Sequence, residues 1–564
     1  MSSWEQRSSA RDTLSRESGF VRKPHGGRLR VALAFPNTYY VGMSSLGFQA
    51  VYRLFNDLDD VVCERVFLPP RPRRAHPRSS PEPLVTLESQ TPVSDFDVVA
   101  FSASFEWDDP NVLTMLRLAG LPIHARARDT RHPLVVVGGA VAQLNPEPLA
   151  PFVDVFAVGD GEVLVPAFSA AVAASGSRPD LLERLARIGG FYVPSLVEPA
   201  VADNGRIAGF APRAGAGFDL PVRRAILPAS QAVEPPSTTI FTPDTEFGSR
   251  LLIEVVRGCP NLCRFCWAGY SCLPVRPFDA GAILRRAAEA RPLAASAGLV
   301  SIALCHHPEI HRILAGLRAM GYRISPASLR LDDLTESLVR EIVTSGERTF
   351  TLAPETGSDR LRRVANKGFT NQQILDAADL VFRNGAENLK LYFMIGLPTE
   401  EDDDLVAIRD LAREVRGRML DRARVKGRAG RIAASVNPFV PKPGTAWQWL
   451  PMTRPDQLER KARRLRALVA DLDNVSFTIK SERHFLYQAL LSVGDRRVSA
   501  VLEAADRNGG NWRAAVAESG IDLDEYLFRD RRHDTVLPWD VVAPGVPVRF
   551  LRSELERSAS EPGP

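Results

Sequence analysis

The sequence has few cysteines, no marked excess of positive or negative charge, and no long apolar runs. It has 6 cysteines among 564 residues, and its 71 lysine and arginine residues nearly balance its 67 aspartate and glutamate residues. This balance gives no whole-protein argument for nucleic-acid binding. No stretch reaches the ~20 apolar residues that cross a bilayer, and the first residues lack the apolar run of a secretory signal. We therefore expect a cytoplasmic protein without a membrane partner.

The scarcity of cysteine makes any tight group of thiols informative. Hydrophobic residues make up 45% and charged residues 24%, which is ordinary globular composition. At 564 residues the chain exceeds the ~250 residues at which single cores stop growing, so we expect several domains. Because cytoplasmic thiols stay reduced, clustered cysteines indicate a metal or redox site and not a disulfide framework.

The first part of the chain predicts an α/β domain. Residues 1–28 are polar and lack apolar periodicity, and we expect them to form a flexible tail. Residues 29–195 alternate short apolar runs with helical spacing, from RVALAF through PLVVVGG to VDVFAVG. This alternation predicts a doubly wound, Rossmann-like parallel sheet. Residues 196–245, with scattered glycine and proline, are expected to be a linker.

A second series of strands and helices occupies residues 246–450. Its strands are predicted in LLIEVV, GLVSIA, ISPASLRL, RTFTLAP, NLKLYFMIGLP and RIAASVNPFVP, with helical stretches such as GAILRRAAEA between them. Six such units predict a partial (β/α)6 barrel of the TIM type. Residues 451–564 are expected to form a mostly helical extension. It either covers the barrel mouth, recruits the substrate or presents a solvated arginine-rich face.

Three of the six cysteines, Cys259, Cys263 and Cys266, fall within RGCPNLCRFCWAGY. Thiolates at this spacing suit three irons of a [4Fe-4S] cluster and leave the fourth iron open for a ligand. A zinc site with Cys272 or a histidine as fourth ligand is an alternative, although the sequence offers no second CxxC pair. Buried core thiols are a further alternative, which the surrounding glycine, proline and asparagine residues disfavour because they are typical of a loop.

The Cys-x3-Cys-x2-Cys pattern, with Phe265 before the third cysteine, resembles the signature of the radical S-adenosylmethionine (radical SAM) superfamily. The motif follows the first strand of a six-unit series, as it does in that family. The resemblance implies that the three cysteines are the metal-binding and catalytic residues and that SAM chelates the open iron. Reductive cleavage of SAM would then give methionine and a 5′-deoxyadenosyl radical. A small flavodoxin- or ferredoxin-type electron donor is implied as well.

The resemblance also implies SAM contacts at the ends of the second and third core strands. Cys305, His306 and His307 occupy the place where family members present backbone carbonyls to the SAM amine, although the usual Gly-Gly-Glu is absent. A metal role for these histidines is an alternative. Ser328 and Arg330 are placed toward the SAM carboxylate and ribose. Alternatively, Arg330 forms an ion pair with Asp332 or Asp333 at the rim.

Further contacts are implied at the ends of the fourth and fifth core strands. In LAPETGSDRL, Glu355 and Ser358 match ribose-contacting positions, and without the family Ser358 is simply a helix N-cap. In YFMIGLPTEE, Gly396 and Pro398 match the backbone that flanks adenine. The proline-rich NPFVPKPGTAWQW at the end of the sixth strand resembles the segment that closes the adenine pocket.

The first domain resembles the cobalamin (B12)-binding domain that precedes many radical SAM cores. The Asp-x-His-x-x-Gly motif that supplies an axial histidine is absent, since none of the 9 histidines has this context. A packing domain that keeps the fold without the cofactor is the alternative. The residues that the resemblance assigns to cobalamin are Gly42, Ser44, Ser102, Gly138, Gly139, Gly159 and Glu162, and it adds Ser104 and Glu106 to the same sheet edge.

The combined pattern predicts a radical SAM enzyme, with cobalamin-dependent methylation of an unactivated carbon as its reaction. Sulfur insertion in the manner of methylthiotransferases is disfavoured, because those enzymes use three N-terminal cysteines and only Cys63 precedes Cys259. Radical rearrangement or RNA modification without cobalamin is a second possibility. The non-enzymatic alternative is an iron–sulfur scaffold or binding protein that has lost turnover. The substrate cannot be read from the sequence, because barrel-mouth loops determine it.

Overall fold

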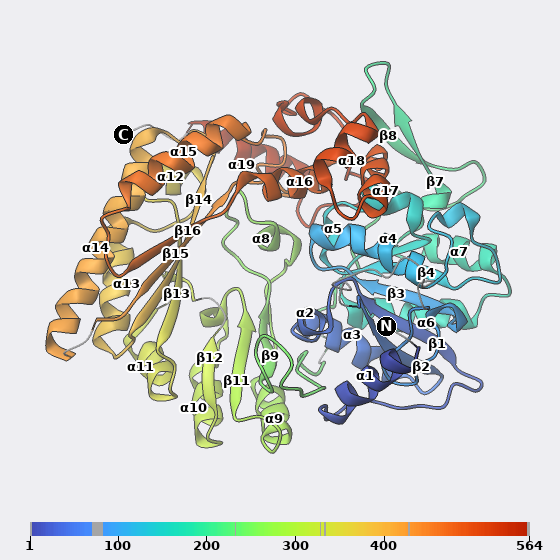
Figure 1. The fold of residues 1–564 in the computed structure, drawn as a ribbon, viewed down its shortest axis with the longest axis horizontal. Helices are drawn as coiled ribbons and strands as arrows, with labels where there is room; N and C mark the ends of the chain where they lie inside the picture. Colours follow the sequence, from blue (N-terminus) through green and yellow to red (C-terminus); the bar gives the residue numbers. More distant parts are fainter. Residues whose placement is uncertain are drawn as a thin grey trace.

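The computed structural model describes residues 3–69, 83–229, 231, 233–326, 329–331, 334–426 and 429–560. Figure 1 shows an N-terminal domain beside a core of parallel strands, with the C-terminal segment crossing the top of both. The expected α/β class is confirmed, because both large bodies are built from parallel strands and flanking helices. No helix among the described residues is long and apolar enough to span a membrane.

The N-terminal domain is a doubly wound sheet with the strand order β2-β1-β3-β4-β5-β6. Its neighbouring strands pair in parallel as far as β5, and β6 is antiparallel. The side chains of its strands are almost all buried on both faces, which is typical of a parallel sheet covered by helices. The strands are β1 (Leu29–Phe35), β2 (Val61–Phe67), β3 (Val98–Ser102), β4 (Leu134–Gly138), β5 (Val155–Ala157) and β6 (Phe191–Tyr192).

Helices cover both faces of this sheet. On one face α3 (Leu46–Asn56), α6 (Gly161–Ala173) and α7 (Arg178–Arg187) pack against one set of alternating strand residues. On the other face α4 (Asp109–Leu118) and α5 (Ala140–Leu144) pack against the opposite set. The carboxyl ends of the strands therefore form one open edge, where such sheets bind ligands.

The first 28 residues differ from the expected flexible tail. Within them the structure places α1 (Ser3–Ser15), and the following Glu17 is buried. Glu17 accepts a hydrogen bond of 2.6 Å from Arg65 of β2, which has no solvent exposure. Ser18 adds a backbone bridge to Phe241 in the linker. The segment is held because a buried guanidinium needs carboxylate partners.

The core contains all six predicted strands, in two described sheets of orders β10-β9-β11-β12 and β13-β14-β15-β16. No pairing between β12 and β13 is found among the described residues, and the segment that joins these two strands is only partly described. The six strands are β9 (Leu251–Arg257), β11 (Ser296–Ser301), β12 (Arg323–Pro326), β13 (Thr349–Glu355), β14 (Asn388–Ile395) and β15 (Ile432–Pro438). To these the structure adds the short β10 (Arg276–Pro277) and β16 (Val475–Ile479).

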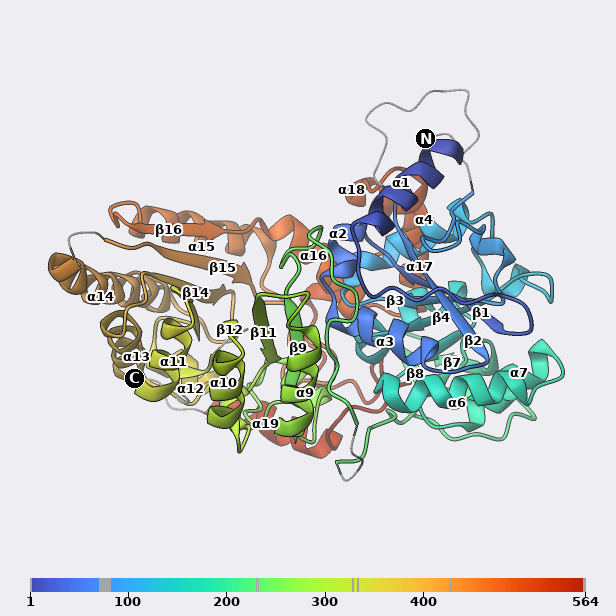
Figure 2. The same ribbon diagram turned by 90° about the horizontal axis from the view of Figure 1, so that it is seen from below.

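The helices of the core lie on the outer side of its strands, as Figure 2 shows from below. They begin at clear sequence signals, since Asp279, Thr335 and Thr370 each cap a helix by accepting a backbone N–H bond. The core helices are α9 (Ala280–Ala290), α10 (Ile310–Ala319), α11 (Glu336–Thr344), α12 (Asp359–Val364), α13 (Asn371–Arg383) and α14 (Asp402–Lys426).

The linker and the C-terminal extension both carry more structure than a connection needs. The linker contains the antiparallel hairpin of β7 (Val197–Val201) and β8 (Ile207–Pro212). The extension is mostly helical as expected, although β16 belongs to it and lengthens the core sheet. Its helices are α15 (Pro455–Leu468), α16 (Glu482–Val493), α17 (Ser499–Arg507), α18 (Trp512–Ser519) and α19 (Val548–Ser560).

The extension joins the two larger bodies. On the side of the N-terminal domain, Asn145 donates a hydrogen bond of 2.7 Å to the Gly494 carbonyl, and Thr114 donates one of 2.7 Å to Asp506. On the side of the core, Arg264 donates a hydrogen bond of 3.1 Å to Glu554 of α19. Because Arg264 lies between Cys263 and Cys266, the extension also supports the cysteine loop.

Candidate functional site

The three motif cysteines lie in the loop that follows β9. Gly258 turns the chain at a φ of +91°, and a Cβ there would lie 2.4 Å from the carbonyl oxygen of Cys272. This close approach folds the loop back on itself and requires glycine. Cys259 and Cys263 are buried, Cys266 is half-buried, and all three thiols are free of disulfides. The loop then enters the short α8 (Trp267–Ser271).

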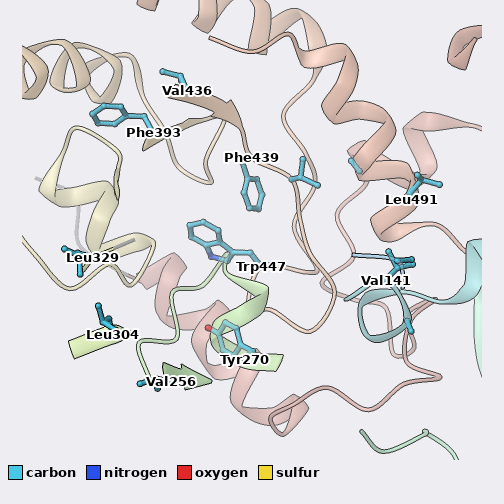
Figure 3. Close-up of a cluster of buried hydrophobic side chains, with 14 of the residues drawn as sticks. Val141, Val256, Tyr270, Leu304, Leu329, Phe393, Val436, Phe439, Trp447 and Leu491 are labelled. Atoms are coloured by element: carbon cyan, nitrogen blue, oxygen red, sulfur yellow. The ribbon is translucent and has the colours of Figure 1, made fainter. Parts of the chain in front are cut away.

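Aromatic side chains pack under this loop. Figure 3 shows Trp447 between Phe439 and Tyr270, and the indole has no solvent exposure. The rings of Trp447 and Phe439 meet edge to face at 5.4 Å. The backbone N–H of Trp447 donates to the Arg264 carbonyl at 3.2 Å, so the segment after β15 is bonded directly to the cysteine loop. The predicted pocket-closing segment therefore supports the loop from below.

Charged residues surround the thiols. Burial raises the pKa of Cys263 against the opposing charges of Lys367 and Arg330, and burial raises the pKa of Cys266 to about 11. Lys367 donates to Glu355 at 2.8 Å and lies 5.9 Å from the centre of the Phe265 ring. The structure thus brings three predicted residues, Phe265, Arg330 and Glu355, to the cysteine loop. Lys367 was given no role, although it belongs to the same predicted ribose-contacting segment, LAPETGSDRLRRVANKG, as Glu355.

The donor set suits an iron–sulfur cluster, because two buried thiols and one half-buried thiol belong to the same loop, beside two cationic side chains. In the described ranges, no group of three or more His, Cys, Asp or Glu side chains is arranged to hold a metal ion. The assignment of Cys259, Cys263 and Cys266 as ligands therefore stays a prediction, which rests on the motif and on the loop.

The predicted contacts after β11 fall into two groups. His307 is buried and fully engaged: its Nε2 donates to the Phe278 carbonyl at 2.6 Å, and its Nδ1 accepts from the Glu309 N–H at 3.0 Å. A structural role explains this side chain, which has no free nitrogen for a metal, and the backbone contact of this segment with the SAM amine stays a prediction. Cys305 is half-buried and His306 exposed in the turn Leu304–His306. Ser328 lies outside the described residues.

The remaining predicted SAM residues make bonds within the protein. Ser358 caps α12 by accepting from the Leu361 N–H, and its hydroxyl also donates to Asp404. Gly396 donates its N–H to Glu400 at 2.7 Å, and its carbonyl accepts from Thr453 at 3.0 Å. Both backbone groups of Gly396 are therefore used internally. Pro398 follows in the half-buried turn after β14.

A cavity of about 410 Å³ lies at the open edge of the N-terminal sheet. Its wall is mostly apolar, with side chains from α3, α6 and the sheet, and Glu254, Arg257 and Val300 of the core complete it. Five residues assigned to cobalamin line this cavity, namely Ser102, Gly138, Gly139, Gly159 and Glu162.

Gly42 and Ser44, also assigned to cobalamin, lie outside this wall. A Cβ on Gly42 would overlap the Phe67 ring at 2.6 Å, so this glycine serves packing. The Ser44 hydroxyl donates to the Tyr40 carbonyl at 2.6 Å and accepts from the Glu246 N–H at 2.9 Å, which ties the linker to the N-terminal domain. Neither residue needs a ligand to explain it.

Two glycines of the cavity wall are required by neighbouring backbone. Gly139 has a φ of +96°, and a Cβ on it would lie 2.4 Å from the Ala103 carbonyl oxygen. Gly159 has a φ of +136°, and its Cβ would lie 2.1 Å from the Ala225 oxygen. Gly138 differs, because its nearest atoms would be 3.7 Å away. Close contact with neighbouring backbone thus explains why positions 139 and 159 are glycine, two positions that the sequence analysis assigned to cobalamin.

One arginine joins the cavity to the cysteine loop. Arg257, the last residue of β9, donates to Glu162 at 2.8 Å and to Glu254 at 2.8 Å, and lies 3.4 Å from Asp160. Burial raises the pKa of Asp160, but the Arg257 and Arg276 charges outweigh this and hold it below its usual range. Sequence reasoning found Glu162 but missed Arg257 and Asp160, since an ion pair between two distant segments leaves no pattern in the sequence.

A second buried contact joins all three parts of the chain. Glu106, expected at the ligand edge, instead forms an ion pair with Lys442 of the segment after β15. Its carboxylate also accepts from the Ser492 hydroxyl of α16 at 2.6 Å. Burial raises the pKa of Glu106, whereas Lys442 and these hydrogen bonds lower it, and the net pKa lies below the usual range. Glu106 is thus a structural junction.

Two family models match this arrangement. Residues 47–194 match the N-terminal region of radical SAM proteins, and residues 253–412, which include the cysteine loop and β9 to β14, match the radical SAM superfamily. The chain is a radical SAM protein. Its N-terminal sheet and cysteine-bearing core are the two matched regions, and the extension lies beyond both.

The chain is similar to known proteins in sequence or in fold. An uncharacterized protein of Methanocaldococcus jannaschii, MJ0966, is 26% identical over 504 residues, which cover 88% of this chain and 96% of that protein. The radical SAM methyltransferase TsrM from Kitasatospora setae, solved with tryptophan and a SAM analogue, has a TM-score of 0.50 at 12% identity, over 87% of this chain and all of that one. The cobalamin-dependent S-adenosylmethionine radical enzyme OxsB has a TM-score of 0.45 at 13% identity. The match covers 68% of this chain and 52% of OxsB, so this chain spans about half the length of that enzyme.

Proposed function

We propose that this radical SAM protein is an enzyme that cleaves SAM reductively at a [4Fe-4S] cluster held by Cys259, Cys263 and Cys266. The observation that carries the proposal is the loop after β9, in which three free thiols, two of them buried and one half-buried, lie near Lys367 and Arg330. When bound, the cluster supplies an electron to SAM and so generates a 5′-deoxyadenosyl radical. A small flavodoxin- or ferredoxin-type protein is the proposed electron donor.

The chain's own residues position and shield this chemistry. Trp447 packs under the cysteine loop and excludes water from that side. Arg264 fixes the loop from within, because it bonds to Glu554 and donates to the Val364 carbonyl at 2.8 Å. Lys367 keeps a positive charge beside the thiols, since its partner Glu355 stabilises the protonated amine in a buried setting.

We further propose that the cavity between the sheet edge and the core holds part of a cobalamin. Its apolar wall suits a flat ring system, and Ser102, Asp160 and Glu162 add polar groups at the rim. The described lining includes no histidine, which agrees with the absent axial-histidine motif. Cobalamin, when bound, supplies a methyl group, and the proposed reaction is methylation of an unactivated carbon.

The first test is production of 5′-deoxyadenosine. Anaerobically reconstituted protein with dithionite and SAM is expected to release it, and Cys263→Ala is expected to lose at least 100-fold of the rate, because one iron loses its ligand. Cys272→Ala is the matched control in the same loop and keeps the activity. A Cys263→Ala variant with unchanged product, or wild-type protein that binds zinc in place of iron, contradicts the assignment and favours a scaffold.

The second test separates cobalamin chemistry from the alternatives. Wild-type protein refolded or expressed with hydroxocobalamin is expected to retain corrinoid absorbance in the visible range. Ala50→Phe on α3 points into the cavity wall and is expected to lower corrinoid retention at least tenfold, whereas Arg53→Phe, on the same helix but outside the wall, keeps it. Production of 5′-deoxyadenosine without corrinoid retention favours radical rearrangement or RNA modification.

A further inference from the structure

A second pocket lies between the β7–β8 hairpin and the C-terminal extension. Its volume is about 620 Å³, within the range of small-molecule sites. The hairpin turn at Arg206, the start of α17 and the segment from Ile521 to Pro538 line it. Figure 1 shows the hairpin beside α17 and α18, away from α8 and the cysteine loop. The pocket is therefore separate from the proposed catalytic site.

Most of the charges in this pocket are paired. Arg206 donates to Glu525 at 2.8 Å, and Arg529 lies 2.7 Å from Asp534. Arg497 forms an ion pair with Asp495. The three pairs account for Asp495, Glu525 and Asp534, and the fourth lining carboxylate, Asp522, accepts from the Asp524 N–H at 2.9 Å.

Arg531 breaks this pattern. Its side chain lines the pocket and is 2% exposed, yet both of its terminal nitrogens are buried without a hydrogen-bond partner. In the part of the chain that the structure describes, no other arginine leaves both terminal nitrogens in this state. Burial and the charge of Arg529 lower the pKa of Arg531 to about 10, although the charges of Asp534, Glu525 and Asp530 oppose this in part.

A buried guanidinium without an acceptor is strongly unfavourable, whereas the same group bonded to an anion is one of the stronger contacts in proteins. The planar fork of arginine matches the oxygens of a phosphate in pairs. We propose that this pocket binds the phosphate group of a small phosphorylated molecule, with Arg531 as the residue that holds the phosphate. The space beyond the guanidinium accommodates the organic part of the ligand.

The test uses the full-length protein and inorganic phosphate as the probe, with binding measured by isothermal titration calorimetry. Wild-type protein is expected to bind phosphate at millimolar or lower concentration and to prefer it to acetate. Arg531→Met is expected to weaken phosphate binding at least tenfold. Arg532→Met is the matched control, because the adjacent Arg532 is exposed, pairs with Asp530 and does not line this pocket.

Thermal unfolding without phosphate provides a second readout. If Arg531 is a ligand, Arg531→Met unfolds at the same temperature as the wild type or higher, because the variant removes an uncompensated buried charge. Phosphate then raises the unfolding temperature of the wild type and of Arg532→Met, but not of Arg531→Met. Absence of phosphate binding to the wild type, equal binding to Arg531→Met, or equal affinity for acetate overturns the proposal.

Discussion

Arg257 donates a hydrogen bond of 2.8 Å to Glu162 across the boundary between the core and the N-terminal sheet. Arg257 ends β9 two residues before Cys259, and Glu162 lies in the first turn of α6 on the cavity wall. Arg257 therefore joins the core to the N-terminal domain at the point where the cysteine loop begins. A ligand in the cavity would lie next to the residue from which that loop departs.

The first prediction concerns this contact. Arg257→Met leaves Glu162 and Glu254 near each other without their shared cation, while Asp160 keeps Arg276, so we expect the free energy of unfolding to fall by about 3–5 kcal/mol. Glu162→Gln keeps a hydrogen-bond acceptor and should lower it by less. Urea unfolding followed by circular dichroism measures both, with the exposed helix residue Arg187→Met as a control that stays within about 0.5 kcal/mol. Equal small effects for Arg257 and Arg187 would show that the contact contributes little.

The second prediction separates backbone from ligand roles among the cavity glycines. Gly159→Ala should lower the free energy of unfolding by more than about 2 kcal/mol, because its φ of +136° disfavours a side chain and the new Cβ would meet the Ala225 oxygen. Gly138→Ala should stay within about 1 kcal/mol, since its Cβ has space. Urea unfolding of both variants checks the difference, and a stable Gly159→Ala would contradict the described turn.

The strands were predictable because their signal is local. Each of the six core strands is a short apolar run between turn residues, and every one appears where the sequence placed it. The cysteine loop was equally readable, since Gly258, Pro260 and Asn261 specify an irregular turn between a strand and a helix. Ser358 was read both as a cap and as a ligand contact, and the structure shows the cap.

The partners of buried charges were not predictable. Glu17 and Arg65 are 48 residues apart, and Glu106 and Lys442 are 336 apart, so neither pair leaves a pattern in the sequence. For that reason residues 1–28 looked like a flexible tail, and Glu106 looked like a residue at a ligand edge. The side-chain bonds of His307 were unpredictable for the same reason, because its two partners are backbone groups whose position only the fold determines.

The third prediction is a pH dependence at the junction near Glu106. Burial raises the pKa of Asp108 to about 6, despite a hydrogen bond of 3.0 Å from Asn37. Above pH 6 the aspartate is ionised in both states and the folded state bears the penalty of burial, whereas near pH 4 the penalty disappears. Asp108→Asn should therefore raise the free energy of unfolding by about 2–3 kcal/mol at pH 8 and change it little at pH 4.

Urea unfolding at pH 8, 6 and 4 measures this effect. Burial raises the pKa of the neighbouring Asp109, and the negative charge of Asp108 helps to raise it, so the variant also removes this repulsion and adds to the stabilisation at high pH. Asp203→Asn, in the exposed turn of the β7–β8 hairpin, is the control and should follow the wild type at every pH. A stabilisation by Asp108→Asn that is the same at pH 8 and pH 4 would show that ionisation of Asp108 is not its cause.

The fourth prediction depends on the proposed cluster and concerns Lys367. A positive charge beside the thiols stabilises the reduced, more negative cluster, so Lys367→Met should lower its reduction potential, by tens of millivolts in order of magnitude, and slow the release of 5′-deoxyadenosine. Lys367→Met also leaves the Glu355 carboxylate without its ion-pair partner. The double variant Lys367→Met/Glu355→Gln removes that unpaired charge as well and so controls for it. Lys461→Met is the matched control, since it breaks a similar pair with Glu400 at 2.7 Å on α15. A redox titration followed by electron paramagnetic resonance measures the reduction potential. The potential should shift in the two Lys367 variants and stay unchanged in Lys461→Met. Equal potentials in all of these proteins would show that Lys367 does not affect the cluster electrostatically.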